Sequence, residues 1–323
     1  MDGSILVTGG AGFIGSNLVD LLLEEDYTVI VLDDLSSGSM ENLSRWSEDS
    51  NLRFVRGDVK RPLDESLTPA VLSGCPRIGT IFHLAAWVDV TSSFERPGDN
   101  ALVNYLGTFN VLDYALKHDV RRVVFASSAA VYGDTTEIPV TETMDKKPLS
   151  PYGLHKLSSE MLLDIYHHQW EKSTASVRFF NVFGPRQDPS NPYSGVISKF
   201  LERASVNEPL LIYGDGKQTR DFIFVEDVAR ALLMTAMSDV TGQLNLGTGK
   251  ETSILDLAEV VGRVSGGELK RIHMPARKGE ILRSCADVSR IREEVGFEAE
   301  IDLLEGMRRT WEWFKRRNIQ DGG

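Results

Sequence analysis

The chain of 323 residues is long enough for one large α/β domain or for two domains, since a domain usually holds about 100 to 200 residues. Hydrophobic residues make up 41% of the sequence and charged residues 25%, which excludes a disordered or low-complexity chain. The formal net charge of −12 disfavours nucleic acid as a partner, because clustered Lys and Arg side chains bind phosphates in such proteins.

The cysteine content and the hydropathy of the sequence indicate the cellular compartment in which we expect the protein. Cys75 and Cys285 are too few for a disulfide framework, and neither has a His or Cys at metal-ligand spacing, so no metal site is expected. The first residues, MDGSILVTGG, lack the basic and apolar parts of a secretory leader, and no stretch approaches the ~18 apolar residues of a transmembrane helix. We therefore expect a cytoplasmic protein with no membrane partner.

Strands and helices alternate along the first half of the chain. An apolar run at 4–8 predicts a buried strand, and the apolar periodicity of 12–25 predicts a helix after a glycine turn. Further strands are predicted at 27–32, 52–56, 80–84, 122–127 and 175–180, with helices near 100–118 and 151–170. This alternation predicts an α/β fold with a Rossmann-type, doubly wound parallel sheet.

The pattern changes after Asn181. The segment NVFGPRQDPSNPYSG resists any regular element and is interpreted as a functional loop that enters a second lobe. The segment DFIFVEDVARALLMTAM predicts a strand and a helix that return to the first domain, and 303–317 predicts an amphipathic surface helix. We therefore expect a Rossmann domain at 1–180 plus about 221–245, and a smaller, discontinuous substrate-binding lobe at about 181–220 plus 246–323.

Three glycines, Gly9, Gly12 and Gly15, follow the first predicted strand in TGGAGFIGSN. Without side chains there, the backbone can approach a pyrophosphate at the N-terminus of the next helix. Glycines after a strand also serve tight packing, so the spacing alone is a weak signal. Asp33 ends the second predicted strand eighteen residues after Gly15, where a carboxylate can hold a ribose 2′-hydroxyl. Together these features predict a dinucleotide site.

The residues after the second strand indicate which dinucleotide binds. Asp33 and Asp34 would repel a 2′-phosphate, and the following LSSGS contains no Arg to accommodate one, so we expect NAD rather than NADP. Asp58 and Val59, just past the third strand, can reach the adenine. Asp58 can equally cap a helix, and both interpretations can hold together.

A second set of residues predicts acid–base chemistry. Tyr152 and Lys156 lie four residues apart at the start of a predicted helix, so they share one face and can act on one molecule. A nearby ammonium and a positive nicotinamide ring favour the phenolate, which makes Tyr152 a candidate general base. Ser128, preferred over Ser127, ends the fifth strand where α/β sheets place ligands. A YxxxK pair alone is more often a surface contact, and either serine can merely cap a turn.

Seven segments in this order resemble the extended short-chain dehydrogenase/reductase family over nearly the whole chain. They are TGGAGFIGSN, HLAA, FASSAAVYG, SPYGLHK, FFNVFGPRQDP, RDFIFVEDVA and RKGEILRSCAD. Within that family the sequence is most similar to the UDP-hexose 4-epimerases, which act on UDP-glucose/UDP-galactose and on their N-acetylated counterparts. The resemblance implies an NAD-dependent isomerase and a homodimer.

The resemblance assigns roles to individual residues. Ser128, Tyr152 and Lys156 match the catalytic triad, and Lys156 also matches the group that holds the nicotinamide ribose. The expected cofactor contacts are Gly9, Gly12, Phe13, Ile14, Gly15, Asp33, Asp34, Ser37, Gly38, Asp58, Val59, Leu84, Ala85, Ala86, Asn104, Ser127, Tyr152, Lys156 and Phe180. The expected substrate contacts are Ser128, Tyr152, Asn181, Val196, Tyr213, Arg220, Arg277, Glu280 and Ser284, with the two arginines facing the diphosphate.

The implied reaction is a 4-epimerisation. Phenolate Tyr152 removes the proton of the sugar 4-hydroxyl while C4 passes hydride to NAD, and hydride returns to the other face of a rotated 4-keto sugar. Ala129 and Ala130 stand where related sugar 4,6-dehydratases carry an Asp and Glu pair, so elimination of water is disfavoured. Val88 stands where some 4-epimerases carry a lysine, so one phosphate contact is absent or supplied elsewhere.

Two positions bear on which sugars the substrate pocket is expected to admit. Glu280 replaces the Asp of the family's RxGD segment, which puts a longer carboxylate in the substrate lobe. Ser284 occupies the position whose bulk limits the C2 side of the pocket in some members. Because serine is small, we expect N-acetylhexosamines to be admitted as well as plain hexoses.

Other interpretations stay open. Another nucleotide-sugar enzyme of the same fold, such as a decarboxylase or a reductase, is the nearest alternative, and product analysis separates it from an epimerase. A non-catalytic NAD-binding regulator is a third, which the intact Ser128, Tyr152 and Lys156 disfavour. The helices at 100–118 and 151–170 can form a dimer interface, or their apolar residues can pack on the sheet.

Overall fold

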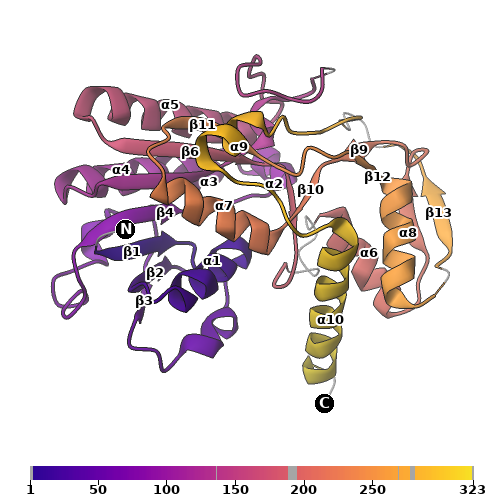
Figure 1. Cartoon of the computed structure of the whole chain (residues 1–323), viewed down its shortest axis with the longest axis horizontal. Coiled ribbons are helices and arrows are strands. Elements are labelled where there is room, and N and C mark those ends of the chain that lie inside the picture. Colours follow the sequence, from indigo (N-terminus) through magenta and orange to yellow (C-terminus); the bar gives the residue numbers. More distant parts are fainter. Residues whose placement is uncertain (1–2, 136, 188–194, 268, 277–280, 322–323) are drawn as a thin grey trace.

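The structure is a computed structural model and describes residues 3–135, 137–187, 195–267, 269–276 and 281–321 (Figure 1). It has a large layer of strands flanked by helices and a smaller group of helices and short strands beside it. None of the helices in these ranges is long and apolar enough to cross a membrane. Arg277 and Glu280, two of the predicted substrate contacts, lie outside the described residues.

The main sheet has seven parallel strands. In chain order they are β1 (Ser4–Thr8), β2 (Val29–Asp33), β3 (Leu52–Arg56), β4 (Ile78–His83), β5 (Arg122–Ser128), β6 (Ser173–Phe179) and β11 (Gly242–Leu246). Their spatial order is β11-β6-β5-β4-β1-β2-β3, so the chain reverses direction across the sheet between β1 and β4. Ligands of doubly wound sheets bind outside the carboxyl ends of the strands at this reversal. The predicted fold class is confirmed.

Helices cover both faces of this sheet. α1 (Phe13–Glu24) and α7 (Val225–Met237) pack on one face, where Leu18, Leu22 and Leu232 are fully buried. α4 (Gly107–Lys117) and α5 (Pro151–Trp170) cover the other face, with Val111 and Leu163 in the core. Because parallel strands are covered on both sides, β1 and β2 are buried along their whole length.

The predicted helix at 100–118 is interrupted. It consists of α3 (Pro97–Ala101), a wider π-helical turn at Leu102–Leu106, and α4. In that turn the Asn104 carbonyl accepts hydrogen bonds from Thr108 Oγ1 at 2.7 Å and Ser159 Oγ at 3.0 Å. These side-chain donors stabilise a turn that ordinary α-helical periodicity does not predict.

Shorter helices connect the elements of the large layer. They are α2 (Val90–Glu95), α9 (Ser289–Val295) and 3₁₀ helices at Met40–Trp46, Leu63–Glu65 and Ala129–Val131. Ile291 of α9 and Phe297 after it pack in the same apolar cluster as α1 and α7. The segment at 289–297 therefore rests on the main sheet.

The smaller group of elements has its own apolar cluster. α6 (Val196–Ser205), α8 (Ile254–Ser265) and α10 (Leu303–Asp321) enclose Phe200, Leu257, Met307 and Trp311. Three two-stranded sheets accompany them: β7 (Asn181–Phe183) with β10 (Phe222–Phe224), β8 (Leu210–Tyr213) with β13 (Arg271–Met274), and β9 (Thr219–Arg220) with β12 (Thr252–Ser253). In Figure 1, α6, α8 and α10 stand together beside the main sheet.

One strand differs from its expected place. The strand before α7 is expected to return to the first domain, but β10 pairs with β7, and the later β11 joins the main sheet beside β6. α7 does return, because its apolar face packs against α1. The predicted division into two lobes stays a prediction.

Candidate active site

The glycine turn between β1 and α1 brings backbone segments into close contact. Gly9 has a φ of +71°, and a Cβ atom there would lie 2.7 Å from the Ala85 backbone nitrogen. A Cβ atom on Gly15 would lie 2.1 Å from the Gly9 carbonyl oxygen. Within the described part of the chain, no side chain caps the N-terminus of α1 at Gly12, and its first turn has no acidic residue. The helix therefore presents its N–H dipoles to an incoming anion.

Two carboxylates lie beside this turn. Asp33 Oδ2 accepts a hydrogen bond from Ala11 N at 3.0 Å, and its Oδ1 accepts one from Leu35 N at 2.8 Å. Burial raises the pKa of Asp33, and the two backbone hydrogen bonds oppose that shift. Asp34 Oδ1 accepts from Ser36 N at 2.9 Å. These oxygens retain lone pairs for ribose hydroxyls and would repel a 2′-phosphate. The glycine turn and the two carboxylates thus form a dinucleotide cradle that fits NAD.

A cavity of about 810 Å³ follows the carboxyl ends of the strands from the glycine turn to α5. A cavity of this size accommodates a dinucleotide-sized ligand in part or in full. Most of the predicted cofactor residues line it. They are Gly9, Gly12, Phe13, Ile14, Gly15, Asp33, Asp34, Ser37, Asp58, Val59, Leu84, Ala85, Ala86, Ser127, Tyr152, Lys156 and Phe180.

Two predicted cofactor residues do not line this cavity. Gly38 packs on the glycine turn, where an added Cβ atom would lie 2.9 Å from the Ala11 carbonyl carbon. Asn104 is buried and clamps the backbone of Trp87, accepting from its nitrogen at 3.0 Å and donating to its oxygen at 2.9 Å. Both residues therefore shape the walls of the site. Asp58 lines the cavity and also accepts a turn hydrogen bond from Lys60 N at 2.9 Å.

The start of α5 places the predicted acid–base group. Ser150 Oγ accepts a hydrogen bond from Gly153 N at 3.1 Å, and Pro151 occupies the first turn, as expected for a helix start. The Tyr152 backbone nitrogen donates to Ser93 Oγ at 3.3 Å. The Ser128 hydroxyl hydrogen-bonds the phenol of Tyr152. The cap and the two serines thus fix Tyr152 at the carboxyl end of β5.

Lys156 lies one turn further along α5 and is also buried. Its Nζ donates to the Ala126 carbonyl oxygen at 2.7 Å and lies 4.6 Å from the Phe125 ring centroid. The distance from Nζ to the Tyr152 ring centroid is 5.9 Å. Ser128, Tyr152 and Lys156, predicted from separate segments, are therefore brought together on one wall of the cavity.

Burial governs the protonation of this pair. It raises the pKa of Tyr152 to about 12, and the Ser128 hydrogen bond only partly opposes the shift. Burial also lowers the pKa of Lys156 to about 7, against the attraction of Glu160. Burial is therefore the larger influence on both groups, and it opposes the phenolate that a nearby ammonium would favour.

The predicted substrate residues are more scattered. Asn181 begins β7 beside Phe180 of the cavity wall, Val196 begins α6 next to Gly195 of the same wall, and Tyr213 ends β8. Arg220, on β9, donates from Nη1 to the Thr219 and Ile281 carbonyl oxygens at 2.8 and 2.7 Å. None of Asn181, Val196, Tyr213, Arg220 and Ser284 lines the main cavity among the described residues.

The residues that follow Ser284 connect it to the cavity wall at Phe180. The next residue, Cys285, accepts a backbone hydrogen bond from Val140 at 2.8 Å. Ala286 packs in a small apolar cluster with Phe180 and Val140. Ser284 itself is half-buried.

The cavity also includes polar residues that the sequence did not indicate. Among them are Asn42, Lys60, Arg96, Asp99, Arg186 and Gln187. Arg186 Nη2 pairs with Asp20 of α1 at 2.7 Å, whereas its Nη1 is buried and has no hydrogen-bond partner among the described residues. The GPR sequence falls within the predicted functional loop, but no periodicity identifies which loop residue points inward.

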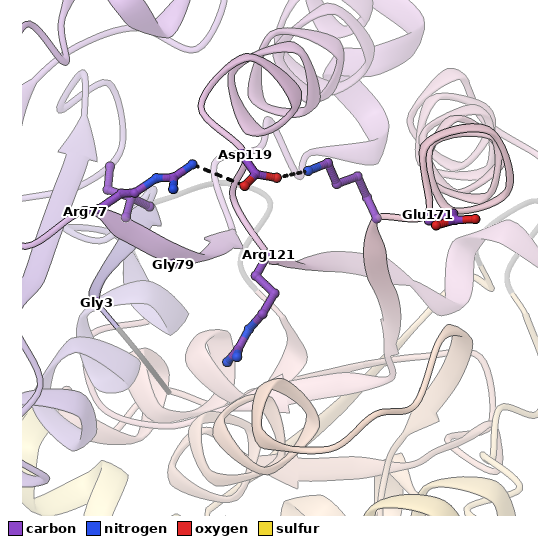
Figure 2. Close-up of a pocket in the computed structure, with 8 residues that line it drawn as sticks. Gly3, Arg77, Gly79, Asp119, Arg121 and Glu171 are labelled. Atoms are coloured by element: carbon purple, nitrogen blue, oxygen red, sulfur yellow. Dashed lines mark hydrogen bonds and ion pairs between the residues drawn. The ribbon is translucent and has the colours of Figure 1, made fainter.

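A second cavity, of about 460 Å³, lies at the opposite edge of the sheet (Figure 2). Its residues precede or begin the strands β1, β4, β5 and β6. Asp119 binds Lys172 Nζ at 2.7 Å and Arg77 Nη2 at 3.4 Å, and Arg77 Nε donates to the His118 carbonyl oxygen at 3.2 Å. These contacts stabilise the end of α4, where cations are favourable. We assign this cavity no function.

Comparisons with known proteins agree with this geometry. A putative UDP-glucose 4-epimerase from Methanocaldococcus jannaschii is 40% identical over 97% of this chain and 99% of the relative. Relatives named as nucleotide-sugar dehydratases and decarboxylases also match over nearly the whole chain.

Two solved structures show the same fold. A UDP-N-acetylglucosamine 4-epimerase from Methanobrevibacter ruminantium M1 has a TM-score of 0.91 and 35% identity, covering 98% of this chain and 99% of that one. A UDP-glucose 4-epimerase from Thermus thermophilus in complex with NAD has a TM-score of 0.86 and 32% identity, covering 97% and 99%. The model of the NAD dependent epimerase/dehydratase family matches residues 5–247, and the chain belongs to this family.

Proposed function

We propose that this chain is a UDP-hexose 4-epimerase that interconverts UDP-glucose with UDP-galactose and UDP-N-acetylglucosamine with UDP-N-acetylgalactosamine. The observation that carries the proposal is that Ser128, Tyr152 and Lys156 line the same cavity as the glycine turn and Asp33. A proton acceptor therefore shares one cavity with a dinucleotide cradle. Relatives and solved structures named as UDP-sugar 4-epimerases support the same substrate class.

The residues that line this cavity have different roles in the proposed reaction. NAD, when bound, would accept hydride from the sugar C4 and return it, and its nicotinamide would add positive charge near the phenol. Tyr152 takes the proton of the 4-hydroxyl and returns it, and Ser128 hydrogen-bonds the phenol during both transfers. Lys156, one helical turn away, supplies an ammonium that favours the phenolate. Asp33 would hold the adenosine ribose and the α1 N-terminus the diphosphate.

The residues after Ser128 favour epimerisation over elimination. Ala129 and Ala130 form a 3₁₀ turn and carry no group that can transfer a proton. Loss of water across C5 and C6 needs an acid and a base near the sugar, and this turn provides neither. A decarboxylase or a reductase remains the alternative enzyme, and each would give a different product.

The substrate test is an NMR assay of the NAD-loaded protein with a panel of nucleotide sugars. Conversion of UDP-glucose and UDP-N-acetylglucosamine to their C4 epimers, without CO2 release or accumulation of NADH, supports the proposal. Formation of a decarboxylated, dehydrated or reduced sugar in place of the epimer would assign the chain to another activity of the family.

We infer that the protein acts as a homodimer. α5 and the segment at 102–109 expose apolar side chains at helical spacing: Leu102, Tyr105, Phe109, Leu154, Met161 and Ile165, each 42 to 60% exposed. A continuous apolar helix face of this kind is typical of a subunit interface. Sedimentation of wild type should give a dimer, and Met161→Glu should shift it toward the monomer. A wild-type monomer at micromolar concentration would contradict the inference.

A further inference from the structure

Three consecutive residues at the end of β5 contact three residues of α5. The Ala126 carbonyl oxygen accepts from Lys156, the Ser127 hydroxyl donates to a Glu160 carboxylate oxygen, and Ser128 hydrogen-bonds Tyr152. Residues 152, 156 and 160 are spaced by four, so they lie on one face of the helix. β5 and α5 are therefore held in register at three successive points, of which the proposed mechanism uses two.

The third point, Glu160, is a buried carboxylate. It is 1% exposed and forms a two-pronged ion pair with Arg178 of β6, from Arg178 Nε at 2.9 Å and Nη2 at 2.6 Å. Arg178 is the strand partner of Ser127, so both groups that bind Glu160 come from neighbouring positions of the sheet. Arg178 Nη1 also donates to the Tyr132 hydroxyl at 2.8 Å. Such geometry fixes the carboxylate firmly, although burying an ion pair contributes little net stability.

Glu160 also sets the charge balance around Lys156. Its negative charge favours the protonated form of Lys156 against burial. The other titratable or charged groups that face this pair are His83 on β4, Arg178 on β6, Tyr132, Glu142 and Lys146 before α5, and Tyr152 and Asp164 on α5. Glu160 is the acidic residue one helical turn from Lys156, on the same face of α5.

We propose that Glu160 is a positioning residue of the epimerase reaction: its buried carboxylate holds α5 in register on β5 and places a negative charge one helical turn from Lys156. The role rests on the proposed function, because Lys156 affects turnover only through the phenolate that it favours. Ser127, which is expected to contact the cofactor, is thereby assigned a second task, since its hydroxyl fixes Glu160.

The first test is Glu160→Gln, which keeps the shape and removes the charge. Lys156 should then lose its proton at lower pH, so the alkaline limb of the kcat profile should move down by about one pH unit and kcat near pH 8 should fall about tenfold. KM for the sugar should change little, since Glu160 does not line the cavity. A fall in kcat with an unmoved alkaline limb would show a purely structural role and overturn the proposal.

Two further variants distinguish the effect of the Glu160 charge from the effect of Glu160 on the register of α5 against β5. Asp164→Asn makes the same carboxylate-to-amide change one turn further along α5, where the partner is Gln243 of β11, and it should leave the alkaline limb unchanged. Glu160→Asp keeps the charge but shortens the reach to Ser127, so it should retain the wild-type limb with a reduced kcat. If Asp164→Asn moves the limb as far as Glu160→Gln does, the proposal is wrong.

A direct titration distinguishes this proposal from the proposed function. NMR of protein carrying ¹³C-labelled lysine, with Lys156 assigned through Lys156→Met, reports its protonation without any turnover. The Lys156 midpoint should fall in Glu160→Gln, stay in place in Glu160→Asp and stay in place in Asp164→Asn. If the Lys156 midpoint shifts in Glu160→Gln but the wild-type protein epimerises no sugar, the proposed function is refuted and the effect of Glu160 on Lys156 stands. If the Lys156 midpoint does not shift in Glu160→Gln, the proposal for Glu160 is overturned. If Glu160→Gln does not fold, Arg178→Met replaces it in the titration: it removes the cation paired with Glu160, so the Lys156 midpoint should rise, and an unmoved midpoint would overturn the proposal.

Discussion

The carboxyl edge of the main sheet and the smaller group of elements hold their proposed functional residues in different ways. Tyr152 and Lys156 are 7% and 2% exposed and lie on a twenty-residue helix that three residues of one strand hold in place. Tyr213, Arg220 and Ser284 are half-buried and lie on strands of two to four residues or in a connecting segment. The residues proposed for the chemistry thus lie on long regular elements, whereas those proposed to contact the substrate lie on short segments.

The largest effect should come from the buried phenol. Tyr152→Phe removes the proton acceptor and leaves the cradle intact, so kcat should fall by about 10² to 10⁴ while NAD stays bound. Epimer formation by NMR and the NAD released on denaturation give the two values. Tyr166→Phe, on the same helix but packed against Trp170, is the matched control and should act like wild type. Normal turnover by Tyr152→Phe would disprove the assigned role.

NAD binding should be nearly as sensitive to a substitution in the glycine turn. In Gly15→Ala the new Cβ atom would lie 2.1 Å from the Gly9 carbonyl oxygen, so the turn must move and NAD affinity should drop by about a hundredfold. Calorimetric titration of the purified protein with NAD measures the change. Gly98→Ala adds a methyl group where no atom lies within 4 Å and should leave the affinity unaltered. Equal affinities for both variants would argue against a cradle at this turn.

The interior of the sheet should also show a pH dependence of stability. His83 is fully buried between Thr8 Oγ1 at 2.8 Å and Thr108 Oγ1 at 3.1 Å, and burial lowers its pKa to about 3. The unfolded chain binds this proton near pH 6.5, so stability should fall as the pH drops from 6.5 toward 3, by about 2 kcal/mol at pH 5. Urea unfolding from pH 7 to pH 4 should show a smaller loss in His83→Gln. Parallel curves for the two proteins would exclude His83 as the source.

The smallest effect is expected at Ser284, which is proposed to contact the sugar. Ser284→Tyr adds bulk at a half-buried position and should lower kcat/KM for UDP-N-acetylglucosamine about tenfold more than for UDP-glucose. Ser284→Ala changes little volume and serves as the control. A wild-type protein that does not turn over the acetylated sugar would remove the basis for this prediction, and an equal loss for both sugars would show general damage.

The sequence predicted regular elements better than contacts between them. The strand at 52–56 and the helix at 151–170 have the predicted bounds, because an apolar pattern is a local signal. The π-helical turn at 102–106 depends on Ser159 from a distant helix, which no local pattern reveals. The pairing of Ser127 with Glu160 likewise depends on the register between β5 and α5. The raised pKa of Tyr152 depends on burial by the folded chain.

Tyr152 and its neighbours are proposed to invert C4 of a UDP-sugar through transient oxidation. The most direct measurement is NMR of the NAD-loaded protein supplied with UDP-glucose that carries deuterium at C4. Because the hydrogen removed from C4 returns to C4 of the same sugar, the UDP-galactose formed should retain the deuterium. UDP-galactose that carries solvent hydrogen at C4, or the absence of the epimer, would contradict it.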